Sequence, residues 1–306
     1  MPKRKPLVLA LGTGVVLAMF CISGMALAAG SYIDMQMGPR PQAMGGAFVA
    51  VADDVNASYW NPAGIPQMEI PTVSFMHSSP FNVAGLSLDY LTFVHPTALS
   101  FMNGGLGLSY QRTAALLEEG NPDAESTNQM DEAIYTLSFG GTLSQYLMYG
   151  MNAKAISLNT STGESSSGSA FDVGMLYLLS PEYSLGFTVR NLAGNLSNET
   201  IPSEKRIGLA GRFSEGKIVL ALDASNKQEV DEARDSWRLH YGAELWVSEN
   251  IALRAGVDKG NFTAGIGLAF DFEGAIEEAS LDYSYTADAD LDYTHRFALA
   301  LALGGI

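Results

Sequence analysis

Histidine and acidic side chains are the groups of this chain best suited to acid–base or metal chemistry. The four histidines stand at 77, 95, 240 and 295, and none has a second histidine at the spacing of a metal site. A Gly-x-Ser-x-Gly motif that would mark an activated serine is missing from the sequence. His240 is expected on an inner strand face beside Arg238. The pattern favours structural histidines and predicts no enzyme, no metal site and no cofactor.

Three alternating aspartates, Asp288, Asp290 and Asp292, begin like a calcium-binding loop. The sixth position of such a loop is normally Gly but here is Tyr293, and no Glu stands at the twelfth position. We therefore expect a solvated acidic loop over 288–292, with weak divalent-ion binding as the alternative.

The first 28 residues have the features of a secretory signal peptide. A basic start at residues 3–5 precedes an apolar run over 7–28, and Ala26-Leu27-Ala28 offers small residues at a cleavage site. We expect cleavage after Ala28. An uncleaved membrane helix and a lipoprotein anchored through Cys21 are the alternatives.

Charge and cysteine content narrow the function further. Loss of residues 1–28 removes three of the 17 basic residues and none of the 33 acidic residues, which leaves a net charge of −19. Nucleic acid is thereby excluded as a partner, because phosphate binding needs clustered cations. Cys21 is the only cysteine, so the mature chain has no disulfide.

A period-two alternation of apolar with small or polar residues is the strongest signal after residue 70, and it predicts β-strands. In one such segment the apolar positions are Phe262, Ala264, Ile266, Leu268 and Phe270. Fourteen segments follow this pattern, an even count that suits a closed antiparallel barrel. They are 70–77, 85–95, 99–111, 132–142, 145–159, 169–179, 183–192, 204–213, 216–224, 236–247, 250–258, 261–272, 278–287 and 293–304.

The connections between these segments alternate in length. Tight turns, such as 180–182 and 214–216, alternate with longer polar connections at 112–131, 159–168, 193–203 and 225–235. Outer-membrane barrels have this asymmetry, with the long loops outside the cell. The longer connections are therefore expected at the extracellular end.

Alternation alone is shared by membrane barrels, whose apolar face meets lipid, and by soluble sandwiches, whose apolar face is the core. Two features favour the barrel. Small residues recur on the polar face, as expected where another segment fills a lumen: Gly186, Gly208, Gly242, Gly256, Gly265 and Gly267. Aromatic residues gather near segment ends, as in interfacial girdles: Tyr146, Tyr183, Trp237, Trp246, Tyr285 and Tyr293.

Residues 44–54, MGGAFVAVADD, and 59–65, YWNPAGI, closely resemble the N-terminal signature of the PorV/PorQ family. That family is related to the FadL-like outer-membrane channels for long-chain fatty acids and aromatic hydrocarbons. The resemblance implies a fourteen-stranded outer-membrane β-barrel with an N-terminal hatch inside it. It departs at the end of the chain, which closes with Gly-Gly-Ile rather than an aromatic residue. Later stretches that resemble family blocks are 172–177, 185–192, 253–256, 281–283 and 294–296.

The strand pattern and the resemblance together predict a signal peptide at 1–28, a hatch at 29–69 and a barrel at 70–306. Asp53 and Asp54 are expected to cap a short helix. Glycines in the hatch permit close approach and unusual dihedral angles. The expected hatch motif is Met44, Gly45, Gly46, Ala47, Asp53, Asp54, Asn61, Pro62, Ala63 and Gly64, with Arg190, Arg206, Arg238 and Arg254 of the inner wall as partners of its acids.

These features predict a protein in the outer membrane of a diderm bacterium, surrounded by lipid, that binds or passes hydrophobic small molecules through a hatch-gated lumen. A PorV-like shuttle or anchor for exported proteins, in contact with secretion-machinery proteins, is the alternative. A purely structural role of the hatch and a soluble periplasmic β protein remain open. The expected ligand pocket comprises Phe48, Trp60, Met148, Leu176, Leu178 and Trp246.

Overall fold

The computed structural model describes residues 35–99, 103–117, 128–161, 163–197, 199–227, 237–288 and 291–304. The predicted signal peptide, residues 1–28, lies outside the described residues.

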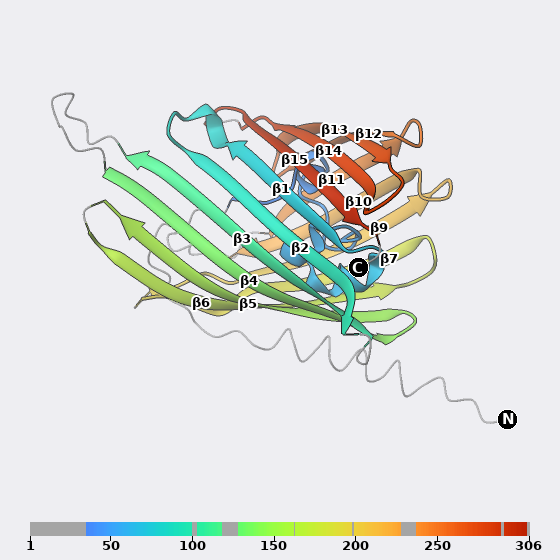
Figure 1. Ribbon diagram of the computed structural model, residues 1–306, viewed down its shortest axis with the longest axis horizontal. Coiled ribbons are helices and arrows are strands. Elements are labelled where there is room, and N and C mark those ends of the chain that lie inside the picture. Colours follow the sequence, from blue (N-terminus) through green and yellow to red (C-terminus); the bar gives the residue numbers. More distant parts are fainter. Residues whose placement is uncertain are drawn as a thin grey trace.

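Strands dominate the described chain and belong to a single antiparallel sheet (Figure 1). Of its 15 strands, β8 (Glu199–Thr200) has only two residues, so fourteen long strands build the wall, as the alternation predicts. These strands are β1 (Thr72–Ser79), β2 (Ser87–Leu99), β3 (Gly104–Leu117), β4 (Asn128–Ser144), β5 (Leu147–Thr160), β6 (Ser165–Leu178), β7 (Tyr183–Leu196), β9 (Glu204–Phe213), β10 (Ile218–Lys227), β11 (Trp237–Trp246), β12 (Ile251–Asp258), β13 (Asn261–Asp271), β14 (Ile276–Thr286) and β15 (Thr294–Leu303).

The sheet closes on itself because its first and last strands pair. β1 runs antiparallel to β15, with Thr72 opposite Ala302, and β6 pairs with β7 to complete the ring. Closure leaves no long strand with an unpaired edge, which a structure surrounded by lipid requires. The fold is the predicted all-β, antiparallel closed barrel.

The period-two alternation separates the outer from the inner face of the wall. On β13, Phe262 is 55% exposed whereas its neighbour Thr263 is fully buried. On β11, Leu239 and Tyr241 face outward while His240, between them, is buried. The apolar face is therefore the outside of the barrel, which rules out the soluble sandwich, whose apolar faces would meet each other.

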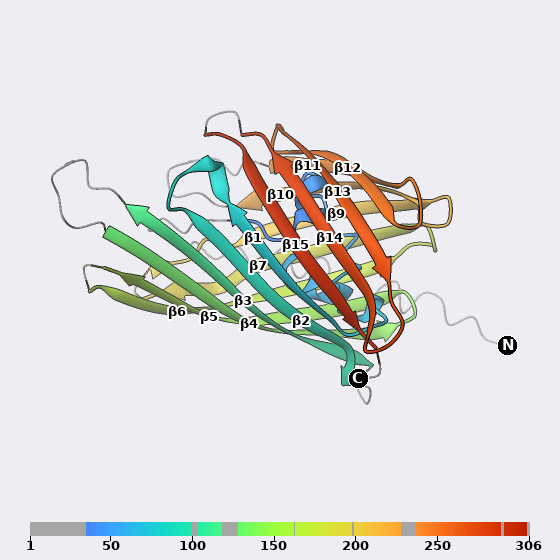
Figure 2. The same cartoon turned by 45° about the horizontal axis from the view of Figure 1, so that its top comes forward.

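The two ends of the barrel differ in their connections (Figure 2). At one end, which we call the short-turn end, two to four residues join successive strands, except where the hatch enters β1. At the long-loop end, β3 and β4 pair as far as Leu117 and Asn128, well into the predicted loop 112–131. β6 likewise begins at Ser165, inside the predicted loop 159–168. The continuations of these strands, such as RTAALL at the end of β3 and SSSG at the start of β6, lack apolar alternation, so pattern alone did not include them.

The N-terminal segment lies inside the ring of strands (Figure 1). It contains α2 (Pro39–Ala43), α3 (Ala57–Trp60) and the 3₁₀ helix η1 (Pro62–Gln67), and it leads directly into β1. We use "hatch" for residues 35–71. A second 3₁₀ turn, η2 (Pro80–Asn82), connects β1 to β2. Among the described residues, the helices are too short to cross a membrane.

Candidate functional site

The glycine pair at the start of the hatch motif rests directly on the barrel wall. Gly45 and Gly46 have φ angles of +66° and +71°, in the left-handed region that favours glycine. A methyl group on Gly45 would come within 2.5 Å of the backbone oxygen of Tyr241 and 2.6 Å of the backbone nitrogen of Val257. Any larger residue here would push the hatch away from β11 and β12.

Wall glycines complete this close fit from the opposite side. A methyl group on the glycines predicted to line the lumen would meet atoms of the hatch or of other inward-facing side chains in every case. At Gly186 the neighbours are the backbone atoms of Val49 and Ala50, and at Gly265 the neighbour is the side chain of Ala43. The predicted reason for these glycines, a lumen occupied by another segment, therefore agrees with the geometry.

Asn61 ties the hatch both to itself and to the wall. Its side chain is fully buried, and its Nδ2 donates to the carbonyl oxygens of Val49 (2.8 Å) and Met175 (3.1 Å), the latter on β6. Its Oδ1 accepts a hydrogen bond from the backbone nitrogen of Ala63 at 3.1 Å. Pro62 follows as the first residue of η1, so the Asn-Pro-Ala sequence begins a 3₁₀ helix as well as ending α3.

The hatch acids Asp53 and Asp54 pair with arginines that sequence reasoning overlooked. Arg40 of α2 binds Asp53 (2.7 Å), Asp54 (2.9 Å) and Glu244 of β11 (2.8 Å). Arg212 of β9 is the second partner of Asp53, at 3.0 Å. The prediction that Arg190, Arg206, Arg238 and Arg254 hold these acids is therefore wrong. Their main partner is Arg40, which belongs to the hatch itself and precedes Asp53 by 13 residues.

These pairs move the two aspartate pKa values in opposite directions. Burial alone would raise the pKa of Asp53, but Arg40 and Arg212 outweigh it and hold that pKa below the usual aspartate value. Burial raises the pKa of Asp54, since Arg40 offsets it only in part and the charge of Asp53 adds to it. Asp54 also accepts a hydrogen bond from the backbone nitrogen of Asn56 (2.8 Å), the cap residue of α3, so the prediction that the aspartates cap this helix is wrong.

Two of the four predicted arginines contact the hatch through other groups. Arg206 donates to the carbonyl oxygen of Gly46 at 2.6 Å, and its guanidinium carbon lies 5.0 Å from the ring centre of Trp60. The guanidinium carbon of Arg190 lies 4.2 Å from the ring centre of Tyr59. Both arginines also bind Glu204 on β9, so neither charge is unpaired.

Of the other two arginines, Arg254 is connected to the hatch only indirectly. Arg254 donates to Glu244 and Asp282, each at 2.6 Å. Because Glu244 also binds Arg40, Arg254 reaches the hatch through a shared carboxylate. Arg238 is half-buried on β11.

The residues expected to form one ligand pocket occupy three separate places. Met148 and Leu176 are buried and pack against Ala63 of η1, with Leu178 at the edge of that cluster. All three face inward, as predicted. The hatch fills the space before them, so they hold η1 in place rather than line an open pocket.

Phe48 and Trp60 belong to the apolar centre of the hatch, where their rings meet edge to face at a centroid distance of 6.3 Å. The indole nitrogen of Trp60 donates to the carbonyl oxygen of Met37 at 2.8 Å. Trp246 instead lies on the inner face of β11, where its Nε1 is 3.3 Å from Glu244. It therefore belongs neither to that apolar centre nor to an outward-facing aromatic girdle.

Asp223 is a further hatch anchor that sequence reasoning missed. Its Oδ2 accepts hydrogen bonds from the backbone nitrogens of Phe48 (2.9 Å) and Val49 (3.0 Å). It is fully buried on the inner face of β10. The sequence could have indicated this inward position, because Asp223 lies on the polar face of the segment 216–224, opposite the face of Leu220 and Leu222.

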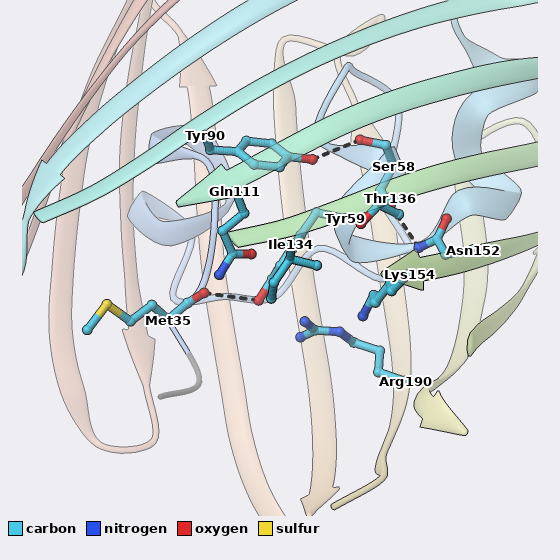
Figure 3. A pocket seen from close by; sticks show the side chains of 10 residues that line it. All are labelled: Met35, Ser58, Tyr59, Tyr90, Gln111, Ile134, Thr136, Asn152, Lys154 and Arg190. Carbon is cyan, nitrogen blue, oxygen red and sulfur yellow. Dashed lines mark hydrogen bonds between the residues drawn. The ribbon is translucent and has the colours of Figure 1, made fainter. Parts of the chain in front are cut away.

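A small cavity remains between the hatch and strands β2 to β7 (Figure 3). It measures about 20 Å³, roughly the space of one water molecule. Tyr59 and Met35 of the hatch border it, together with Lys154 and Arg190 of the wall. Lys154 binds Asp172 at 2.8 Å, so both cations beside the cavity have acidic partners.

A larger cavity of about 400 Å³ lies between the hatch and strands β1, β14 and β15, towards the short-turn end. The inner face of β15 carries only small residues there, Ala298, Ala300 and Ala302, and these leave the space open. Acidic groups of both the hatch and the wall border the cavity: Asp53, Asp54, Glu69, Glu278 and Asp282.

His240 lies between a serine and an aspartate on neighbouring strands. Its Nε2 is 2.8 Å from Ser225 Oγ, and its Nδ1 is 2.7 Å from Asp258 Oδ1. This is the order of groups in serine-hydrolase triads. However, Ser225 is only 2% exposed, and the backbone of Gly46 lies against the imidazole. The arrangement thus packs β10, β11 and β12 beneath the hatch, as expected for a structural histidine.

The acidic loop lies partly outside the described residues, which include Asp288 and Asp292 but not Asp290. Asp288 accepts hydrogen bonds from Asn261 Nδ2 and from the backbone nitrogen of Leu291, both at 3.1 Å. Across the described part of the chain, no group of three His, Cys, Asp or Glu side chains is placed to hold a metal ion. Weak divalent binding at this loop stays an untested alternative.

Neither a protein-family model nor a curated protein sequence matches this chain. Solved structures do match it over nearly their whole length. The CymD monoaromatic hydrocarbon channel is 13% identical and has a TM-score of 0.64, with 89% of this chain and 98% of that chain covered. The toluene transporter TodX of Pseudomonas putida is 12% identical, with a TM-score of 0.64 and coverages of 91% and 98%.

A FadL homologue of Pseudomonas aeruginosa is 11% identical and has a TM-score of 0.61, covering 91% of this chain and 99% of that chain. At such identities the likeness concerns the fold. The chain therefore has the fold of these FadL-like channels.

Proposed function

We propose that this protein is an outer-membrane barrel that passes hydrophobic small molecules from the cell surface towards the periplasm. The observation that carries the proposal is the cavity of about 400 Å³ between the hatch and β1, β14 and β15, in a lumen otherwise filled by the hatch. The FadL-like fold supports it, since the similar structures named above include hydrocarbon channels.

The outer face of the wall fits a lipid environment. Large apolar residues face outward all around the ring, from Phe75 on β1 to Leu299 on β15. Tyr146 and Tyr183 lie outward at the short-turn end, and Trp237 lies outward at the long-loop end, as girdle residues do. Following the usual orientation of such barrels, the short-turn end faces the periplasm, so the 400 Å³ cavity is the periplasmic exit.

Passage along this route requires a change at the cavity side of the hatch. Asp53 and Asp54 border the cavity, and their ion pairs with Arg40 are partly exposed. Small inner residues on β15 let a ligand of roughly monoaromatic size lie against the wall. The function is transport without chemistry, and it needs no cofactor.

Uptake of p-xylene by a diderm host that lacks its own hydrocarbon channel tests the proposal. Cells that make the protein should take up p-xylene at least fivefold faster than cells without it. Ala300→Phe, which fills the cavity, should remove most of this gain. Leu299→Phe is the matched control, because it enlarges the neighbouring residue on the outer face of the same strand. Equal uptake with and without the protein would refute the proposal.

Native mass spectrometry of the protein extracted from membranes in detergent gives an independent test. A retained hydrocarbon or lipid-like molecule supports passage of hydrophobic compounds. Recovery of the protein without detergent would contradict placement in the outer membrane altogether.

The motif at 44–65 also favours a second candidate, a PorV-like anchor or shuttle for exported proteins, because it resembles the PorV/PorQ signature. Membership of that family is part of this proposal. A secretion component or cargo that co-purifies under mild extraction, and is lost when residues 118–127 within the predicted loop 112–131 are deleted, would support the anchor. If such a partner is found, and cells with the wild-type protein take up p-xylene no faster than control cells, the anchor function is favoured over transport.

A further inference from the structure

One buried acid in the lumen differs from all the others described. Four of the five buried acids have a partner: Asp172 binds Lys154, Glu204 binds two arginines, Asp223 accepts from the hatch backbone, and Glu244 binds Arg40. Glu132 is the fifth. It is only 4% exposed, and it has neither a hydrogen bond nor an ion pair with any described residue.

The inner face around Glu132 carries apolar side chains together with the polar side chains of Thr113 and Gln111. On the inner face of the wall its cross-strand neighbours are Thr113 on β3 and Leu158 on β5. Ile134, two residues away on the same face, belongs to a buried apolar cluster with Ile156, Ala170 and Ile201. The Thr113 hydroxyl is also buried and has no described hydrogen-bond partner.

An unpaired carboxyl group at this place weakens the barrel. Burying a carboxyl without a partner is costly, and another isoleucine would continue the apolar cluster without that cost. The cost is recovered only if something else supplies the missing hydrogen bond. Ile134 and Gln111 border the small cavity of Figure 3. Glu132 and Thr113 are the next inward-facing residues on the same two strands, towards the long-loop end.

We propose that Glu132 and Thr113 recognise a hydroxyl group on an otherwise apolar ligand. A carboxylate accepts hydrogen bonds, and a threonine hydroxyl can donate one, so the pair complements a group that both donates and accepts. The isoleucine cluster contacts the apolar body of the ligand. A ligand that enters from the long-loop end meets this pair before it meets the hatch, so phenols and similar alcohols are selected at entry.

The cavity of about 20 Å³ is too small for such a ligand, so a side chain must move aside. Met35 borders the cavity and has an unbranched, flexible chain that repacks readily. Its displacement extends the cavity without breaking the ion pairs of Lys154 and Arg190.

The inference rests on the proposed transport function, and a matched pair of ligands separates the two. p-Cresol and p-xylene have nearly the same shape and differ by a hydroxyl in place of a methyl group. The measurement is the ratio of p-cresol to p-xylene uptake in the host cells described above, with barrel assembly checked by heat-dependent gel mobility. Glu132→Leu should lower this ratio at least fivefold, Glu132→Gln less, and Thr113→Val about two- to threefold.

Glu249→Leu is the control, since it replaces an exposed acid in the turn between β11 and β12 and should leave the ratio unchanged. If Glu132→Leu fails to assemble, the Gln and Val variants decide. A ratio that stays at the wild-type value in these variants overturns the inference while transport stands. Absence of protein-dependent p-xylene and p-cresol uptake overturns the transport function and the inference with it.

Discussion

The two sides of the hatch contact the barrel wall in different ways. Against β2 to β7 and β9 to β13 the hatch touches the wall directly: its backbone lies close to wall glycines such as Gly186, and buried side chains such as Asn61 and Asp223 bond hatch to wall. Against β1, β14 and β15, alanines leave a cavity of about 400 Å³, and partly exposed ion pairs border it. We call the first region the fixed side and the region around the cavity the cavity side, where α2 still packs on β14 beside the open space.

This difference assigns separate tasks to the two sides. The residues that carry the family-like signature, Gly45, Gly46 and Asn61, all lie at the fixed side or within the hatch core. They seat the hatch, which is the structural role left open by the sequence. Any movement that lets a ligand pass is expected at the cavity side, where Asp53 and Asp54 are the residues of the signature that border the cavity.

The largest effect is expected from adding a methyl group at the fixed side. Gly186→Ala brings a side chain against the backbone of Val49, and overpacking of this kind costs about 1–3 kcal/mol. Gly211→Ala is the control, because its methyl group would meet only the rings of Phe213 and Tyr183 on the outer face. Urea unfolding in detergent should show a lower midpoint for Gly186→Ala alone. Equal midpoints would mean that the hatch does not press on this wall.

Removal of the Asn61 side chain should come next. Asn61→Ala leaves the carbonyl oxygens of Val49 and Met175 without their donor, at about 1–3 kcal/mol for buried groups. Gln67→Ala removes two hydrogen bonds from the cavity side, where the side chain is only partly buried, and should cost less. Hydrogen exchange of residues 44–65 should accelerate more in Asn61→Ala. Faster hydrogen exchange in Gln67→Ala than in Asn61→Ala would contradict the assignment of Asn61 to the more firmly held side of the hatch.

The acids at the cavity rim should respond to pH with opposite signs. The lowered pKa of Asp53 means that its pairs stabilise the hatch at neutral pH and lose that effect as pH falls through the folded pKa. The raised pKa of Asp54 means that its charge costs stability at neutral pH, and the cost disappears as pH falls through its folded pKa.

Asp53→Asn should therefore destabilise the hatch at pH 7 and have little effect in strong acid, whereas Asp54→Asn should be neutral or stabilising at pH 7. Limited proteolysis of the hatch across this range measures both. Loss of hatch stability in both variants at pH 7 would show that the two aspartates act as one unit.

The smallest effect is expected from a cross-link at the fixed side. The Oγ atoms of Ser58 and Thr92 are 3.1 Å apart, so Ser58→Cys and Thr92→Cys should form a disulfide between α3 and β2. Uptake of p-xylene should stay within twofold of wild type, because α3 need not leave the wall. If uptake stops on oxidation and returns with a reductant, the gate lies at the fixed side instead.

Much of the barrel was predictable because alternation reports directly which way a side chain faces. It predicted fourteen strands and the inward direction of Met148, Leu176 and Arg254. Alternation could not predict how far along the barrel axis a side chain lies, because that position depends on strand tilt and stagger. Arg190 and Arg206 therefore reach Tyr59 and Gly46 rather than the hatch acids.

The partners inside the hatch were harder to predict. Arg40 precedes Asp53 by 13 residues, with the turn at Gly45 and Gly46 between them, and only the folded path brings them together. The isolation of Glu132 was also beyond the sequence, since it depends on which polar groups neighbouring strands present. Glu132 is the first residue of the predicted segment 132–142, and alternation could not show that it lacks a partner.

Pairing of β1 with β15 joins positions 72 and 302, near the two ends of the described chain. The hatch precedes β1, so it must already lie between the growing strands when this last pair forms. Closing such a long loop carries a large entropic cost, and a hatch held by Asp223 and Asn61 reduces the freedom of the strands that remain to be joined. The hatch therefore helps to set the circumference at which the barrel closes, and a chain without it is expected to insert slowly or with the wrong strand pairing.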